Sequence, residues 1–69
     1  MKSIVLLGGG PEQADAIKIS KELGYNTIVL DSNPLVVGRK FADKFIQCDI
    51  ANSSQVFRNI ENLGVHGLM

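Results

Sequence analysis

The fold is decided by residues 4–11, which read Ile-Val-Leu-Leu-Gly-Gly-Gly-Pro. A short run of branched apolar residues is typical of a strand that is covered on both faces, as in a parallel sheet. Three glycines then allow a tight turn, and proline fits the first helical position because it has no N–H and its φ is already helical. We therefore expect a strand, a turn and a helix in direct succession. The helix should run to about Leu23 and end at Gly24, with Ala16, Ile19 (or Ser20) and Leu23 on its buried stripe and with Ala14 and Ile17 widening that stripe.

The alternation of strand and helix continues to the end of the chain. Turn-forming residues 31–34 close the second strand, and residues 35–40 have no clear period, so we expect a loop there with a short helical turn at 39–44. Asn52 or Ser53 should cap the second helix. Its expected buried stripe is Val56, Phe57, Ile60 and Leu63. The further strands are expected at Asn26–Leu30, Phe45–Cys48 and Val65–Met69.

This order predicts an α/β fold: a Rossmann-like three-layer unit with an all-parallel sheet of strand order 3-2-1-4. The fourth strand has no turn after it, so the chain reads as truncated after strand 4. We expect residues 1–69 to be the N-terminal domain of a longer protein, and therefore a fragment.

Composition excludes several kinds of protein. Seven basic and seven acidic residues give zero formal net charge, without the basic patch that nucleic-acid binding needs. The longest apolar run, Ile4–Leu7, is far too short to cross a membrane. The single cysteine, Cys48, cannot form an internal disulfide and suits the cytoplasm. Cys48 and His66 alone give no metal-ligand spacing, so neither a metal site nor a catalytic group is expected within the chain.

The glycine turn, Gly8–Gly10, is the first candidate binding site. Glycines let a ligand approach the backbone, and the helix behind them presents unpaired N–H groups that favour phosphate or carboxylate. The alternative is a tight turn without a ligand. Gly8 and Gly10 match the first two glycines of the dinucleotide fingerprint, but Gln13 replaces the third and Pro11 removes an N–H, which weakens an NAD interpretation.

Polar residues around this turn extend the candidate site. Glu12 and Gln13 flank its mouth, where they would recognise polar ligand groups or simply form a solvated first helical turn. Asp31 closes the second strand and would bind a ribose hydroxyl or start an Asx turn ahead of Asn33 and Pro34.

Three stretches together resemble the N-terminal domain of ATP-grasp enzymes. They are Leu6–Pro11, Leu23–Pro34 and Phe41–Phe45. The Gly-Gly-Gly-Pro and Ser-Asn-Pro pieces look most like carbamoyl phosphate synthetase large subunits, whereas the Ala-Asp after the loop looks like biotin carboxylases. The chain lacks the long insertion that follows Gly-Pro in the synthetases, which favours a smaller synthetase-like ligase.

The resemblance implies a substrate-binding portion of an ATP-dependent carboxylate–amine or carboxylate–thiol ligase that works through an acyl phosphate. ATP and magnesium would bind in later domains, outside residues 1–69. Gly8–Gly10, Glu12 and Gln13 would face a small carboxylate or amine substrate, and Asp31, Asn33 and Pro34 would line the neighbouring wall.

Two other classes of protein share the glycine turn. One is the regulatory nucleotide-binding or NAD-binding module of the potassium-channel type, and the other is an NAD-dependent dehydrogenase. Whatever the class, the bare apolar edge of the last strand predicts self-association, most simply as a dimer.

Overall fold

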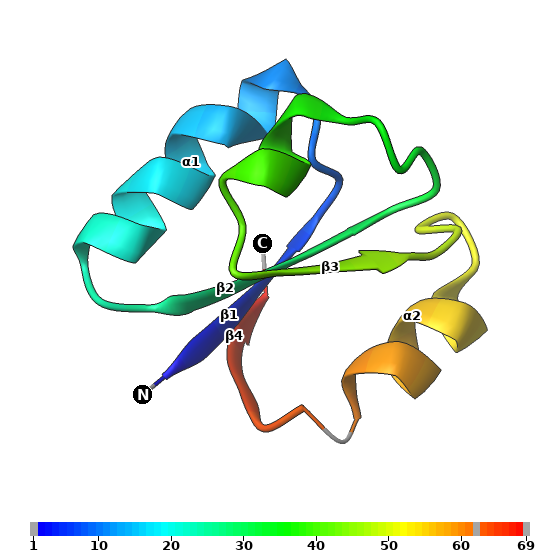
Figure 1. The fold of residues 1–69 in the computed structure, drawn as a ribbon. Coiled ribbons are helices and arrows are strands. Elements are labelled where there is room, and N and C mark those ends of the chain that lie inside the picture. Colours follow the sequence, from blue (N-terminus) through cyan, green and yellow to red (C-terminus); the bar gives the residue numbers. More distant parts are fainter. Residues whose placement is uncertain (1, 62, 69) are drawn as a thin grey trace.

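The computed structural model describes residues 2–61 and 63–68. Strands and helices alternate along the chain, as Figure 1 shows. The elements are β1 (Ser3–Leu7), α1 (Pro11–Glu22), β2 (Asn26–Asp31), the 3-10 helix η1 (Val37–Lys40), β3 (Lys44–Gln47), α2 (Ser53–Ile60) and β4 (Val65–Leu68). The expected strands are therefore confirmed to within a residue or so at each end, although the expected end of the fourth strand at Met69 lies outside the described residues.

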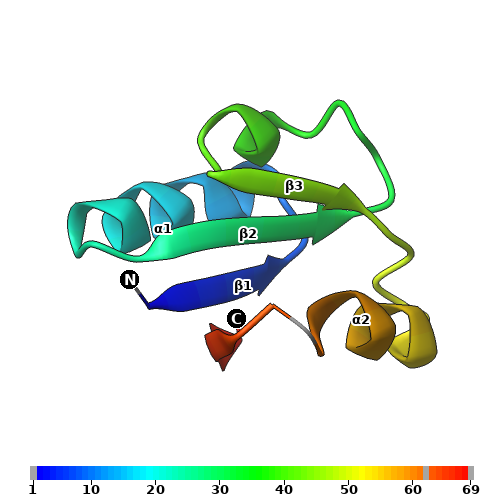
Figure 2. The same ribbon diagram turned by 60° about the horizontal axis from the view of Figure 1, so that its bottom comes forward.

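The four strands form one sheet of order β3-β2-β1-β4, and every neighbouring pair is parallel. In Figures 1 and 2, α1 and η1 cover one face of this sheet and α2 lies across the other. The core is divided accordingly. Val5, Leu30 and Val56 belong to the cluster beneath α2, whereas Leu6 and Ile17 belong to the cluster beneath α1. The Rossmann-like three-layer prediction is confirmed.

Helix α1 starts and stops where the sequence indicates. Pro11 occupies its first turn, and Gly24 follows the helix end with a φ of 91°. The expected buried stripe is confirmed only in part. Ile17 and Ser20 face the sheet, whereas Ile19 and Leu23 are 55% and 71% exposed. The helix is rotated so that the positions of Ile17 and Ser20 face the sheet and those of Ile19 and Leu23 lie on its outer flank.

Helix α2 is shorter than expected. Asn52 caps it, with its side chain accepting a hydrogen bond from the Gln55 amide at 3.2 Å, and the helix ends at Ile60. The helix has only about two turns, and the two side chains that face the core from it are Val56 and, one turn later, Ile60. Phe57 lies a residue off that line and is 67% exposed, so its expected burial is wrong.

Hydrogen bonds between Asp43 and Thr27 join the amino ends of β2 and β3. The Asp43 carboxylate accepts hydrogen bonds from the Thr27 amide at 2.8 Å and from the Thr27 hydroxyl at 3.0 Å, and the Lys21 ammonium lies 3.4 Å away. These hydrogen bonds, led by the one from the Thr27 amide, hold the pKa of Asp43 below its usual value. The Ala-Asp motif thus has a structural role at the edge opposite the glycine turn.

Among the described helices, none is long and apolar enough to span a membrane.

Candidate functional site

The glycine turn links the carboxyl end of β1 to the start of α1, beside the point between β1 and β4 where the strand order of the sheet reverses. In open parallel sheets this is the place where ligands bind. Gly8 has a φ of 95°, which only glycine adopts without strain, and its amide donates to the Leu30 carbonyl at 2.7 Å. Gly8 is therefore required by the turn itself.

Gly9 is required by packing. A Cβ at this position would lie 2.9 Å from the side chains of both Val29 and Val36. Gly38 of η1 rests on the turn from the other side, with its amide donating to the Gly9 carbonyl at 2.7 Å. The expected loop at residues 35–40 is thus partly a 3-10 helix, and the helical turn expected at 39–44 lies earlier, because Gly38 can approach the Gly9 backbone closely.

Asp31 fastens the glycine turn to the end of β2. One oxygen of its carboxylate accepts from the Gly9 amide at 2.9 Å, and the other accepts from the Asn33 amide at 2.9 Å. The second bond is the Asx turn that the sequence left as one of two options. Because both oxygens are engaged, a ribose hydroxyl would have to share or displace an existing bond.

Asn33 and Pro34 complete the loop after β2. The Asn33 side-chain oxygen accepts from the Leu35 amide at 3.0 Å, and the Pro34 carbonyl accepts from the Arg39 guanidinium at 2.8 Å. Both residues therefore lie beside the glycine turn, through Asp31, but these hydrogen bonds stabilise the loop.

The open part of the site consists of Gly10, Glu12 and Gln13. Within the described chain, the amides of Gly10 and Glu12 make no hydrogen bond. The Glu12 side chain folds back over Gly10, so that an added Cβ would lie 2.8 Å from both of its carboxylate oxygens. The Gln13 amide nitrogen donates to the Leu7 carbonyl at 3.2 Å, which is how a glutamine fits where the dinucleotide fingerprint has glycine.

The site therefore combines two free N–H donors with one free carboxylate. The Gly9 amide, expected to help bind an anion, is already bonded to Asp31, and the Glu12 carboxylate adds a negative charge at the mouth. Such a mouth repels a pyrophosphate and suits a ligand that carries both an acceptor and a positive donor. Among the described residues, no cluster of three or more acidic, histidine or cysteine side chains could hold a metal ion.

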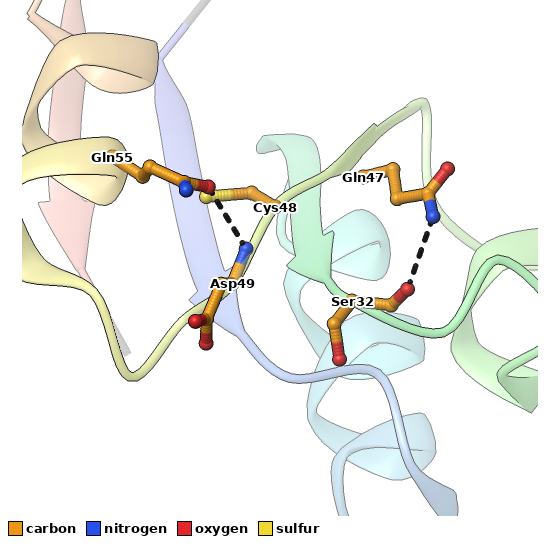
Figure 3. A pocket seen from close by; sticks show the side chains of 5 residues that line it. All are labelled: Ser32, Gln47, Cys48, Asp49 and Gln55. Atoms are coloured by element: carbon orange, nitrogen blue, oxygen red, sulfur yellow. Dashed lines mark hydrogen bonds between the residues drawn. The ribbon is translucent and has the colours of Figure 1, made fainter.

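A second feature at the same edge of the sheet was missed by the sequence reasoning. A hollow of about 340 Å³ lies at the ends of β2 and β3. It is lined by Ser32, Gln47, Cys48, Asp49 and Gln55, whose side chains are drawn in Figure 3. Cys48 is buried, as its apolar strand predicts, with its sulfur accepting from the Asn59 amide nitrogen at 3.5 Å. In the sequence, only the position of Asp49 directly after a parallel strand could have signalled the hollow.

The chain is similar to ligases. It is 36% identical over 50 residues to the 3-methyl-D-ornithine–L-lysine ligase of Methanosarcina barkeri (strain Fusaro), and 40% identical over 48 residues to the enzyme of the same name from Methanosarcina mazei. The crystal structure of phosphoribosylglycinamide synthetase from Anaerococcus prevotii superposes with a TM-score of 0.87 over 97% of the chain, at 30% identity. All are ATP-grasp enzymes. The chain is an ATP-grasp N-terminal domain.

This domain is a small part of each relative. The matches cover 72% and 70% of the chain but only 14% and 13% of the two Methanosarcina ligases, and 17% of the synthetase. No family model matches the chain. The resemblance drawn from the glycine turn and the Ser-Asn-Pro loop is confirmed at the level of the ATP-grasp domain.

Proposed function

We propose that residues 1–69 form the substrate-side domain of an ATP-dependent ligase, and that the glycine turn binds the substrate other than ATP. The observation that carries the proposal is the pair of free amides at Gly10 and Glu12, beside a carboxylate, at the switch point of the sheet. Gly8 and Gly9 shape the turn, so Gly10 is the glycine that packing leaves open to a ligand.

The charges of this mouth favour an amino acid or a related amine. The free N–H groups of Gly10 and Glu12 would donate hydrogen bonds to the ligand's carboxylate, and the Glu12 side chain would swing outward to pair with the ligand's ammonium group. Gln13 has an oxygen free to accept from the same ammonium, since its nitrogen is held by the Leu7 carbonyl. Such a ligand is consistent with the Methanosarcina relatives, whose names describe ligases that join an ornithine derivative to lysine.

The remaining residues of the site would act indirectly. Asp31 holds Gly9, while Asn33 and Pro34 shape the loop that supports Asp31. ATP and magnesium would bind in other domains of a longer protein. There the substrate carboxylate would be converted to an acyl phosphate, which an amine or thiol attacks. We place this ligase in the cytoplasm, in keeping with a single cysteine that is buried and free.

The test is an NMR titration of the ¹⁵N-labelled chain with L-ornithine. We expect saturable shifts of the amides of Gly10, Glu12 and Gln13, and at least several-fold weaker binding in Glu12→Gln because a charge-assisted bond is lost. Glu22→Gln, at the other end of the same helix, is the matched control and should bind like the parent.

Two further arms decide what the turn recognises. Sodium sulfate tests the simpler anion site, and should bind more tightly to Glu12→Gln than to the parent because the repelling carboxylate is gone. Ornithine shifts that are equal in the parent, Glu12→Gln and Glu22→Gln would overturn the proposed amine contact. Absence of any response at the turn to either probe would leave it with a structural role only.

A further inference from the structure

The hollow at the ends of β2 and β3 has two polar walls. On one wall, the Gln47 amide nitrogen donates to the Ser32 carbonyl at 3.2 Å. On the other, the Asp49 amide donates to the Gln55 side-chain oxygen at 3.3 Å. Figure 3 shows the two bonded pairs on either side of Cys48, and all five residues line the hollow. The first bond holds the Gln47 side chain by its nitrogen and the second holds the Gln55 side chain by its oxygen, so each glutamine keeps its other amide atom for a ligand.

The atoms left free are balanced between donors and acceptors. Asp49 uses one carboxylate oxygen to accept from the Ala51 amide at 3.0 Å, and its other oxygen makes no bond within the described chain. The free nitrogen of Gln55 stands on the same wall. The opposite wall offers the free oxygen of Gln47 and the Ser32 hydroxyl, which both donates and accepts. Each wall therefore presents at least one donor and one acceptor.

This balance discriminates among ligand groups. A phosphate or carboxylate only accepts hydrogen bonds and would be repelled by Asp49. An ammonium group only donates hydrogen bonds, so it could not accept one from the Gln55 side-chain nitrogen. A hydroxyl group donates and accepts at once, so one hydroxyl satisfies each wall.

The size and the charge of the hollow also favour a small neutral ligand. At about 340 Å³ the hollow is at the small end of ligand pockets, large enough for a single ring and too small for a dinucleotide. Asp49 is the only charged side chain among the lining residues. It lies just before α2, whose amino end carries a compensating partial positive charge, so a neutral ligand meets no net repulsion.

From these walls we infer a second ligand site that binds two neighbouring hydroxyl groups of a sugar ring, one against Asp49 and Gln55 and the other against Gln47 and Ser32. It is separate from the glycine turn and does not depend on the proposed ligase function. The ring can belong to a free sugar or to a nucleoside, since both present the same pair of hydroxyls.

The experiment is an NMR titration of the ¹⁵N-labelled chain with methyl β-D-ribofuranoside. We expect saturable shifts at Ser32, Gln47, Asp49 and Gln55, with a dissociation constant of about 1–10 mM, as an open site with a few hydrogen bonds allows. Tetrahydrofurfuryl alcohol, which has the ring without the adjacent hydroxyls, should give no saturable shift. Adenosine separates the sources: equal affinity identifies a sugar ligand, and tighter binding identifies a nucleoside.

Asp49→Asn keeps the oxygen that accepts from Ala51 and removes the charge, so it should weaken riboside binding about tenfold without unfolding the turn. Asp15→Asn, an exposed carboxylate on α1 across the sheet, is the matched control and should bind like the parent. Gln47→Ala, on the exposed edge of β3, should weaken binding several-fold and carries the test if Asp49→Asn loses its folded spectrum. Equal shifts with the riboside and the alcohol, or equal binding by all variants, would overturn the inference.

Discussion

Replacing Gly38 with alanine tests how the glycine turn is built. An added Cβ at Gly38 would lie 2.6 Å from the Gly9 carbonyl oxygen, 2.7 Å from the Ile17 Cδ1 atom and 3.1 Å from the Gly9 Cα atom. Two of these three neighbours are backbone atoms and cannot rotate away. The η1 segment must therefore move off the turn, which stretches or breaks the 2.7 Å hydrogen bond between the Gly38 amide and the Gly9 carbonyl.

The cost follows from those contacts. Overpacking of this kind costs about 1–3 kcal/mol, and the hydrogen bond adds about 1 kcal/mol. Alanine also lowers the conformational entropy of the unfolded chain, which offsets about 0.4–1 kcal/mol of this loss of stability. We expect Gly38→Ala to lower the free energy of unfolding by about 2–3 kcal/mol. A chain of this length has roughly 3–10 kcal/mol in total, so the loss is large.

The assay is urea denaturation followed by far-UV circular dichroism, since the chain has no tryptophan. Gly10→Ala is the matched control, because it adds the same methyl group where only the flexible Glu12 side chain must move. Its φ of −66° suits alanine, and the cost should stay below about 1 kcal/mol. If Gly38→Ala were as stable as Gly10→Ala, the close approach of η1 to the turn would not be the reason for glycine at position 38.

Three other outcomes are expected. Asp43→Asn should destabilise the chain by about 1 kcal/mol at neutral pH, discounted because the carboxylate is 37% exposed. The folded-state pKa of Asp43 is lowered, so this stabilisation is present above the unfolded pKa of about 3.9 and lost as pH falls through the folded value. Urea titrations between pH 7 and pH 2 should therefore show parent and variant converging in acid, whereas a constant gap would refute the charge effect. The chain should not hydrolyse ATP above the buffer rate in a phosphate-release assay, since it has no phosphate-binding lysine after the glycines; activity that survives repurification and is abolished by Glu12→Gln would place ATP at the turn. Sedimentation equilibrium should show self-association through the open edge of β4 (Val65–Leu68), and a monodisperse monomer at high concentration, with slow amide exchange in that strand, would contradict it.

The sequence was sufficient for the architecture because its signals are local. The apolar run before the glycines, the proline after them and Gly24 beyond the helix each limit the backbone within a few residues. Together with the rule that crossover connections yield parallel strands, they predict a parallel sheet, and the Rossmann-like pattern supplies its order.

The buried face of each helix was harder to predict from the sequence, because apolar residues at neighbouring helical positions are equally compatible with a buried stripe. Ile17 and Ile19 are equally apolar, and only the rotation of α1 against the sheet decides that Ile17 is buried and Ile19 exposed. The same holds for Val56 and Phe57 on α2, where the shorter helix leaves the larger residue outside.

The sequence by itself determined that three glycines join a strand to a helix at the carboxyl edge of a parallel sheet, because turn geometry is written in adjacent residues. Only the tertiary structure decided what each glycine is for. Gly9 lies against Gly38, 29 positions along the chain, and its amide bonds to Asp31, 22 positions along. These pairings depend on how η1 and β2 return to the turn, and no local pattern encodes the distance between segments so far apart. That return leaves Gly10 and Glu12 as the open donors of the turn.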